Sequence, residues 1–235
     1  MGKIGWMVLG GILVFFTALA VYNANNPSEN IHHNDAPWNA QMVEGKADAP
    51  NKMIEYSDYF CQFCTMFHNQ ASSDKFQKDY IDSGKISLET RIITVLSGQS
   101  PNTEQGAEAA FCAADQKKFK QYSSHIIPRI KKDFFDKGVG VKAFEGRMLT
   151  QPKPIAKLPQ SYFSISAKAT GLDVTKFERC MQDRTHQAKI AANTQKAIDL
   201  GVSGLPYIVV NNYIANGFED SWQSFELLLK AGDVK

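Results

Sequence analysis

The sequence predicts an α/β fold in which a long, all-helical insertion interrupts a β-sheet. Three observations lead to this prediction. A strand-like segment at 51–60 precedes a helical pattern at 61–84 and a second strand at 85–96. Residues 103–200 have helical character, and 201–235 return to strand composition before a closing helix.

The bulk properties are those of a globular protein. The chain has 235 residues, of which 43% are hydrophobic and 11% aromatic, so it can bury a sizeable core and a disordered chain is excluded. This length suits one elaborated domain or two small ones. The formal net charge of +2 is too close to neutral to indicate nucleic acid as a partner.

The N-terminal segment, residues 1–24, decides the expected compartment. Residues 4–22 are nineteen residues without a charge, longer than the roughly 7–15 of a signal peptide's apolar region and within the roughly 17–25 of a membrane span. This length favours a retained anchor, although the small-x-small pattern of Ala18 to Ala20 leaves cleavage open. Lys3 places the N-terminus inside. We therefore expect the bulk of the chain outside the cytoplasmic membrane, tethered and facing the periplasm or cell exterior, or soluble there if the segment is cleaved.

Residues 25–45 are polar, rich in Asn and without periodicity, which indicates a flexible linker. The His32–His33 pair within it has no carboxylate or cysteine neighbours in register, so we do not expect a metal site there. The folded part then divides into a first α/β portion at 46–102, a helical insertion at 103–200 and a second α/β portion at 201–235.

Each element of the expected fold has a local basis. Apolar residues at 63, 66, 67, 76, 80 and 81 follow a helical rhythm that Gly84 closes, and 85–96 is β-branched and apolar. Residues 103–130 are rich in Ala, and Asp173 marks the start of a later helix. Near the end, "NN" and "NG" supply turns between strands, and Ser221 caps an amphipathic helix at 221–232.

Two cysteines, Cys61 and Cys64, lie at the junction between the first strand and its helix. Zinc needs four ligands, and the chain has only one CxxC pair; haem attachment needs a His where Thr65 stands. A disulfide across two intervening residues removes little entropy from the unfolded chain, so it makes a poor structural link. Thiol–disulfide exchange is the chemistry that remains.

The position of the pair assigns the two thiols different roles. At the start of a helix, unpaired N–H groups and the positive end of the helix dipole favour the thiolate form of Cys61. Cys64 lies one turn further in and is expected to be better buried. We therefore expect Cys61 to attack and Cys64 to resolve the mixed disulfide.

Four segments together resemble the DsbA-like thiol–disulfide oxidoreductases: "MIEYSDYFCQFC", "AEAAFCAADQKKF", "FERCMQDRT" and "LGVSGLPYIVVNN". They occur in the order expected for that family, and the resemblance runs from about Gly45 to Lys235. It implies a thioredoxin-like fold with an inserted helical subdomain. It also implies that Cys61 is the nucleophile and Cys64 the resolving cysteine of a redox disulfide.

The resemblance assigns two further catalytic positions. Glu55 matches the buried acid that assists proton transfer, and burial would raise the pKa of a carboxyl in that place. Pro206 matches the cis-proline that faces the redox disulfide. The alternatives are a surface acid at the edge of a strand for Glu55 and an ordinary trans-proline for Pro206.

Apolar side chains near the pair suggest a site for unfolded chains, formed by Phe63, Leu205 and Pro206. Two positions depart from the family pattern. Gln62-Phe63 lacks the proline that often follows the first cysteine, and Leu205 replaces the more usual Thr or Val. Both positions tune the thiolate, so the oxidising strength stays open.

Cys112 and Cys180 lie 68 residues apart, both in expected helices of the insertion. Joined, they would pin one helix to another, which is worth about 4 kcal/mol in the chain-entropy model. The alternative is two buried free thiols that behave as small hydrophobes. We favour the disulfide, because a free thiol near a thiol oxidase is a liability.

We therefore expect an extracytoplasmic oxidoreductase that introduces disulfides into exported polypeptides with free thiols. No organic cofactor or metal is required for this exchange, and we expect a monomer that binds no nucleic acid. The resemblance implies reoxidation by a quinone-linked membrane partner. Two alternatives remain: a reductase or isomerase of the same fold, although residues 23–45 are too short for the dimerisation domain usual in isomerases, and a non-catalytic chaperone.

Overall fold

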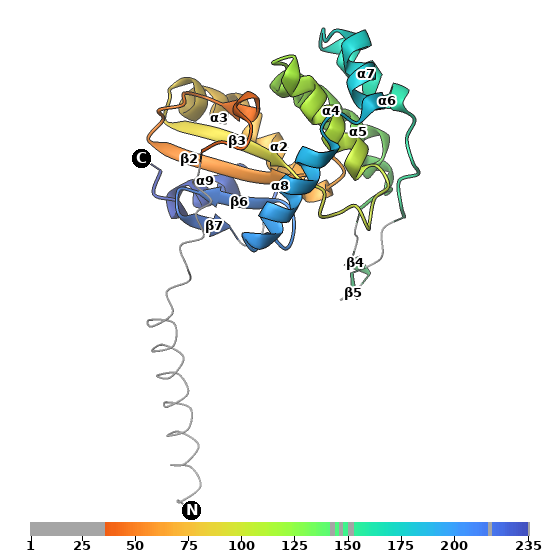
Figure 1. The fold of residues 1–235 in the computed structure, drawn as a ribbon. Coiled ribbons are helices and arrows are strands. Elements are labelled where there is room, and N and C mark those ends of the chain that lie inside the picture. The colour runs from red at the N-terminus through yellow and green to blue at the C-terminus, as the bar shows by residue number, and fades with distance from the viewer. Residues whose placement is uncertain (1–35, 142–143, 146–147, 150–152, 216–217, 235) are drawn as a thin grey trace, which may run out of the picture. The chain divides into compact units, whose positions relative to one another are not determined.

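The computed structural model describes residues 36–141, 144–145, 148–149, 153–215 and 218–234 (Figure 1). The expected membrane anchor at 4–22 and the linker as far as residue 35 lie outside these ranges. Within the ranges, no helix is both long enough and apolar enough to span a bilayer.

A five-stranded mixed sheet forms the first layer of the fold. Its strands, in spatial order, are β1 (Val43–Glu44), β3 (Ile86–Ile92), β2 (Asn51–Ser57), β6 (Tyr207–Val210) and β7 (Tyr213–Ala215). Strand β2 runs parallel to β3 and antiparallel to β6. The chain therefore leaves the sheet after β3 and returns at β6, on the other side of β2.

Strand β2 occupies the centre of the sheet and is buried at every position except Lys52. A strand with neighbours on both sides and helices on both faces is buried along nearly all of its length, here including the polar Asn51, Glu55 and Ser57. It ends at Ser57, earlier than the predicted 51–60, because residues 58–61 turn: the N–H of Cys61 donates to the carbonyl of Asp58 at 3.1 Å. This turn delivers Cys61 to the start of the next helix.

The predicted helix at 61–84 is divided in the structure. Helix α2 (Gln62–Ala71) ends, and Ser73 caps a new start by accepting from the N–H of Phe76. The short α3 (Asp74–Phe76) then continues into a π-helical turn, η2 (Gln77–Asp82). With α9 (Trp222–Ala231), these segments bury a cluster of rings that includes Phe67, Phe76 and Phe225.

Five longer helices separate β3 from β6: α4 (Thr103–Asp115), α5 (Phe119–Asp133), α6 (Gln160–Ala169), α7 (Val174–Asp183) and α8 (Gln187–Asp199). Figure 1 shows α4 to α7 beside the sheet, with α8 leading back towards it. Their shared core includes the fully buried Phe111, Tyr122, Phe163 and Phe177.

The insertion contains more than helices, which corrects the all-helical expectation. A 3₁₀ turn, η3 (Phe135–Lys137), and the antiparallel pair β4 (Phe144–Glu145) and β5 (Met148–Leu149) lie between α5 and α6. Gly138 and Gly140 have φ values of +73° and +75°. Left-handed backbone of this kind ends a helix, and glycine adopts it without steric strain.

Residues 36–45 were expected to belong to the flexible linker, yet the structure ties them to the sheet. The N–H of Trp38 donates to Glu89 Oε1 at 2.7 Å, and the guanidinium of Arg91 lies 4.4 Å from the centre of the Trp38 ring. Met42, in the 3₁₀ turn η1 (Ala40–Met42), is 2% exposed. The side chains of Trp38 and Met42 therefore fix this segment to the folded part, although its composition is that of a linker.

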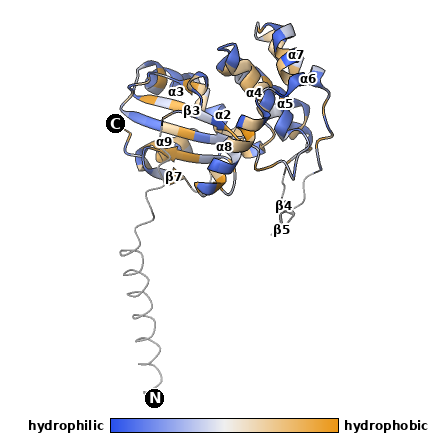
Figure 2. Cartoon of the chain, in the orientation of Figure 1, coloured by the Kyte–Doolittle hydropathy of each residue, from blue (hydrophilic) through white to orange (hydrophobic). Residues whose placement is uncertain are grey.

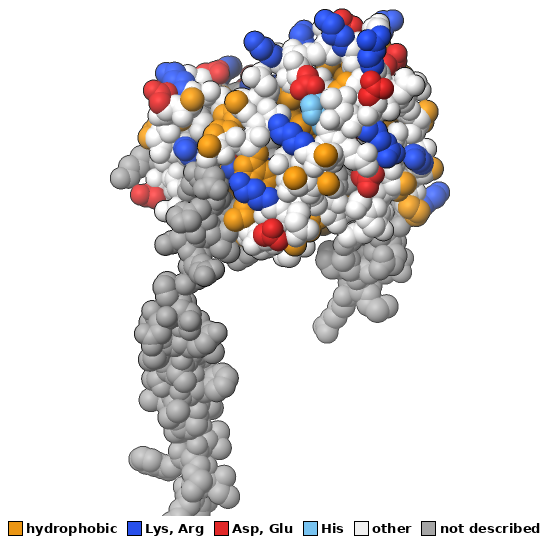
Figure 3. All heavy atoms as spheres, viewed as in Figure 1, with side chains coloured by type: hydrophobic (Ala, Val, Ile, Leu, Met, Phe, Trp, Pro, Cys, Tyr) orange, Lys and Arg blue, Asp and Glu red, His pale blue; other side chains and the backbone are white. Residues whose placement is uncertain are grey.

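Hydropathy follows these layers. Figure 2 shows hydrophobic residues concentrated on the strands and on one side of several helices. On the face seen in Figure 3, basic and acidic side chains are interspersed.

The structure joins Cys112 of α4 to Cys180 of α7 by a disulfide. Replacing both residues by Ala should lower the free energy of unfolding by about 2–4 kcal/mol, because the bond closes a 68-residue loop in the unfolded chain. Urea unfolding of the oxidised protein measures this loss. The matched control is Cys61→Ala/Cys64→Ala, which leaves the Cys112–Cys180 bond in place, and equal stability of the two double variants would contradict the expectation.

Candidate functional site

Cys61 is the N-cap of α2, so its sulfur lies where the helix presents unpaired N–H groups. The N–H of Cys64 donates to Cys61 Sγ at 3.3 Å. Cys61 is 6% exposed. Neither Cys61 nor Cys64 forms a disulfide, so the structure represents the dithiol form of the pair. The sulfur of Cys61 therefore accepts a hydrogen bond from the N-terminal turn of the helix.

Cys64 lies one turn into α2 and is 3% exposed. Burial raises the pKa of its thiol well above the ordinary value, and the neighbouring Cys61 and Glu55 raise it further. The two sulfurs are therefore unequal: Cys61 has a donor for a thiolate, whereas Cys64 is held as a thiol. This inequality is what sequential attack and resolution require.

The Leu205–Pro206 peptide bond is cis, and this segment lies directly against the pair. The thiol of Cys61 donates to the carbonyl oxygen of Leu205 at 3.5 Å. Residues 205–207 are half-buried. The side chain of Leu205 packs beside the cluster of Ile54 and Val209, which turns part of its apolar surface inward.

Phe63 lies in the first turn of α2 and is 38% exposed, one of the few large hydrophobic side chains with so much solvent contact. An exposed aromatic ring two residues from a reactive sulfur is available to an approaching polypeptide. The three positions expected to bind substrate thus differ, with Phe63 open to solvent and Leu205 and Pro206 partly covered.

Glu55 is a fully enclosed carboxyl in the middle of β2, only 4% exposed. Burial raises its pKa to about 8, partly opposed by a hydrogen bond of 2.7 Å from Ser57 Oγ, while the charge of Glu44 raises it slightly. Its charge also acts on the Cys64 thiol. Glu55 is therefore protonated at neutral pH and lies close enough to the resolving cysteine to affect its ionisation.

Asp58 is a second buried carboxyl, and the sequence reasoning missed it. It is 2% exposed, and burial raises its pKa to about 6, against hydrogen bonds from the Phe60 N–H at 2.8 Å and from Thr103. Asp58 shapes the turn before Cys61, and its backbone hydrogen bond lowers the pKa of Cys64. The sequence feature that could have identified Asp58 is its position three residues before Cys61.

A cavity of about 20 Å³ lies beside Glu55, between β2 and helices α2 and α5. This volume suffices for about one water molecule. Burial lowers the pKa of His68, on its wall, to about 4, so this imidazole is neutral at physiological pH. The polar side chains that line the cavity are Glu44, Glu55, Ser57, Tyr59, His68, Ser72, Thr90, Lys120 and Ser123.

The CxxC pair is not where potential metal ligands gather. Within the part of the chain that the structure describes, four such side chains meet around the Cys112–Cys180 disulfide instead. The arrangement at Cys61 and Cys64 is that of a dithiol near a buried carboxyl whose pKa is raised. It can exchange disulfides without a bound ion or organic group.

Comparison with known proteins agrees with this geometry. "Probable disulfide bond formation protein D" of Bacillus anthracis is 26% identical over 201 residues, which are 86% of this chain and 83% of that protein. Among solved structures, oxidised BdbD from Bacillus subtilis matches with a TM-score of 0.62 at 18% identity, over 82% of this chain and 93% of its own. The thiol-disulfide exchange protein α-DsbA2 of Wolbachia pipientis has a TM-score of 0.57 at 17% identity, over 90% and 92% of the two chains.

These matches confirm the resemblance to DsbA-like proteins expected from the sequence, and at such identities the solved structures establish the fold. The family model described as "Thioredoxin" spans residues 38–231, from the docked Trp38 through the last helix. The chain therefore belongs to the thioredoxin family.

Proposed function

We propose that this thiol–disulfide oxidoreductase introduces disulfides into exported polypeptides, with Cys61 as the nucleophilic position and Cys64 as its resolving partner. The observation that carries the proposal is the contrast between the two sulfurs. Cys61 is the N-cap of α2 and accepts from the Cys64 N–H, whereas burial raises the pKa of Cys64. Relatives named disulfide bond formation proteins support the direction of transfer.

In the oxidising direction, a substrate thiolate attacks Cys61 in the Cys61–Cys64 disulfide. A bond forms between the substrate sulfur and Cys61, and Cys64 leaves with the electron pair. A second substrate thiolate then attacks the substrate sulfur of the mixed disulfide, which releases Cys61 as a thiolate that the helix N-terminus stabilises. Two substrate thiols become one disulfide, and the pair ends as a dithiol.

Glu55 supplies the proton that Cys64 needs as it leaves. Because burial makes a Cys64 thiolate unfavourable, its departure is easier when an acid protonates it. Glu55 carries a proton at neutral pH, since its pKa is raised to about 8. We assign it the role of general acid in oxidation, and of general base when the reaction runs in reverse.

The small cavity beside Glu55 is a route by which Glu55 regains a proton from solvent after oxidation, or loses one to solvent in the reverse reaction. One water there would connect Glu55 with the polar wall, at whose outer end Lys120 Nζ lies 2.7 Å from Glu44 Oε2. The side chain of Lys120 is about half exposed, so this ion pair meets bulk water.

Residues 205 and 206 and the exposed ring of Phe63 are proposed to receive the substrate chain. Its thiol must approach Cys61, and the Leu205 carbonyl already lies 3.5 Å from that sulfur. Main-chain contacts of this kind bind extended polypeptides with little dependence on their sequence. Such tolerance suits an enzyme with many clients.

Localisation and reoxidation complete the proposal. Residues 4–22 would anchor the protein to the cytoplasmic membrane with its folded part outside, where disulfides persist. A quinone-linked membrane protein would return the dithiol to the disulfide. The expectation of a monomer without nucleic acid remains part of this proposal.

The reduction potential of the Cys61–Cys64 couple tests the direction. We expect a value above about −150 mV, because a thiolate-stabilising site favours the reduced pair, as in strongly oxidising members of this class. Equilibration with glutathione, followed by alkylation and mass spectrometry, measures it. A value near thioredoxin's, about −270 mV, would instead indicate a reductase.

Single cysteine variants provide the matched controls for that measurement. Cys64→Ala leaves a mixed disulfide at Cys61 without an internal resolving thiol, so covalent complexes with substrate should accumulate. Cys61→Ala, which retains only the buried thiol, should form none. Equal trapping by both variants would refute the assignment of roles.

Glu55→Gln should slow formation of the mixed disulfide by about 10²-fold at pH 7, the lower end of what a positioned acid contributes. In the unsubstituted protein, the rate per substrate thiolate should fall as pH rises through about 8, because Glu55 then loses its proton. Stopped-flow kinetics across this pH range measures both effects. The Gln variant should lack the falling limb.

Ser57→Ala is the matched control, since it removes the hydrogen bond that holds the pKa of Glu55 down while leaving the carboxyl in place. Its falling limb should move to higher pH. An unchanged limb in both variants would assign the proton transfer to another group.

Deleting residues 1–24 should move the protein from the membrane fraction to the soluble extracytoplasmic fraction or, if export fails, to the cytoplasm. Cell fractionation with an antibody against the folded part measures this. If the protein expressed without the deletion is found in the soluble extracytoplasmic fraction, the segment is cleaved and the proposed tether is wrong.

A further inference from the structure

We propose that the Cys112–Cys180 disulfide, once reduced, forms a zinc site with Glu108 and His186. The four side chains each offer one ligand atom, and these atoms lie within 4.8 Å of one another. Two thiolates, an imidazole and a carboxylate are a ligand set that Zn²⁺ prefers in proteins. The site is separate from the CxxC pair.

The fold brings the four ligands together from three helices. Glu108 and Cys112 are four residues apart on α4 and therefore share one face of it, with Glu108 Oε1 3.9 Å from Cys112 Sγ. Cys180 belongs to α7, and His186 is the N-cap of α8. In a tetrahedral zinc site with bonds of about 2.0–2.3 Å, ligand atoms lie about 3.3–3.8 Å apart. Reduction must therefore let the two bonded sulfurs separate, while the other ligand atoms, already within 4.8 Å, need only small shifts.

Neighbouring contacts orient the ligands as they do in known zinc sites. Nε2 of His186 lies 2.7 Å from Asp115 Oδ2, which leaves Nδ1 as the nitrogen available to an ion. The N–H of His186 donates to Glu108 Oε1 at 2.8 Å and holds that carboxylate in place. A carboxylate behind a ligating imidazole fixes its ring and raises its basicity.

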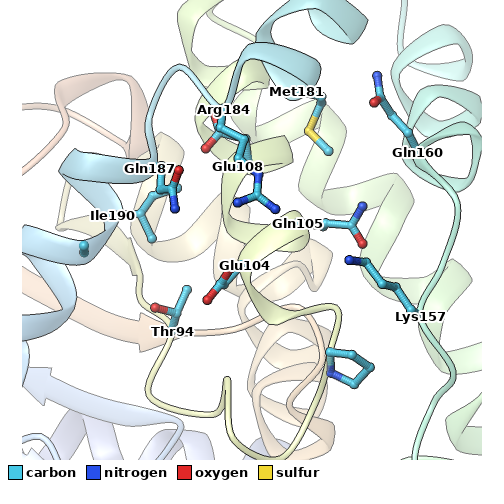
Figure 4. Close-up of a pocket in the computed structure, with 12 residues that line it drawn as sticks. Thr94, Glu104, Gln105, Glu108, Lys157, Gln160, Met181, Arg184, Gln187 and Ile190 are labelled. Atoms are coloured by element: carbon cyan, nitrogen blue, oxygen red, sulfur yellow. The ribbon is translucent and has the colours of Figure 1, made fainter.

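The cluster has an entrance and a balanced charge. A cavity of about 170 Å³ opens onto Glu108, and Figure 4 shows Glu108 and Arg184 on its wall. Two thiolates and a carboxylate leave one net negative charge around Zn²⁺, and Arg184, whose charge already acts on Glu108, offsets it. The cavity therefore brings solvent to Glu108, the one member of the cluster on its wall.

The chemistry has two steps. A dithiol reductant transfers two electrons and two protons: its own two S–H bonds become one S–S bond, while the Cys112–Cys180 bond breaks and two thiols form. Zn²⁺ then displaces the two thiol protons and binds both sulfurs. Zinc would thus stabilise the reduced state of this pair, and the site exists only after the disulfide has opened.

The test uses the full chain with Cys61→Ser/Cys64→Ser, so that the CxxC pair binds no metal. After reduction and removal of the reductant, Zn²⁺ is titrated against a chromophoric chelator, and Cd²⁺ replaces it to reveal thiolate-to-metal charge-transfer absorption. We expect one ion per chain from the reduced protein and none from the oxidised protein. Absence of binding after reduction would overturn the proposal.

Variants distinguish this site from two thiols acting alone. Glu108→Gln keeps the acceptor for the His186 N–H but loses the charge, and Asp115→Asn weakens the orientation of the ring. Each should lower zinc affinity by about 10–100-fold. Glu104→Gln, an exposed glutamate on the same helix and the same cavity wall, should not change it. Equal affinity in all three variants would refute the four-ligand site.

A second readout does not depend on how well a variant folds. In a glutathione buffer, Zn²⁺ should shift the Cys112/Cys180 equilibrium of the otherwise unsubstituted protein towards thiols, as measured by alkylation and mass spectrometry. The shift should be smaller in Glu108→Gln, whose oxidised form is checked by circular dichroism. An equilibrium that zinc leaves unchanged would contradict the proposal.

Discussion

The central position of β2 is the constraint on which the site depends. Its parallel pairing with β3 and antiparallel pairing with β6 place the end of β2 next to the start of β6. Cys61 follows the end of β2, and Leu205–Pro206 precedes the start of β6. Two strands that are far apart in the sequence therefore bring the sulfur and the cis peptide together. About 140 residues separate Cys61 from Leu205 in the sequence, and the register of the sheet holds the two residues together.

Desolvation acts on this arrangement through three ionisable groups. Burial raises the pKa of Glu55, Asp58 and Cys64, because it disfavours the charged form of each group. For Glu55 the folded value is about 8 against 4.5 for the free group, so the folded protein binds more protons between these pH values. Its contribution to stability is therefore present below about pH 4.5 and is lost as pH rises through 8. This loss accompanies the burial of a carboxyl close to the Cys64 sulfur.

Local pattern was enough to predict the central part of the site. The CxxC between strand and helix indicated exchange chemistry, and spacing placed Glu55 in the same strand. What could not be predicted depends on side chains from distant segments. The buried Asp58 interacts with Thr103 at the start of the helical insertion, and the contact of Trp38 with Arg91 joins two segments that have no shared pattern. The break of the helix after α2 likewise follows from a cap by Ser73, within a run whose apolar rhythm continues.

Helix α4 connects the two cysteine pairs. Near its beginning, Gly106 lets α4 approach the turn before Cys61: a Cβ there would lie 3.1 Å from the ring of Phe60. Tyr59 and Phe60 consequently share one core with Phe111, further along the same helix. At its other end, α4 is fixed to α7 through Cys112 and Cys180. A change in that bond therefore acts on the element that packs against the Cys61 turn.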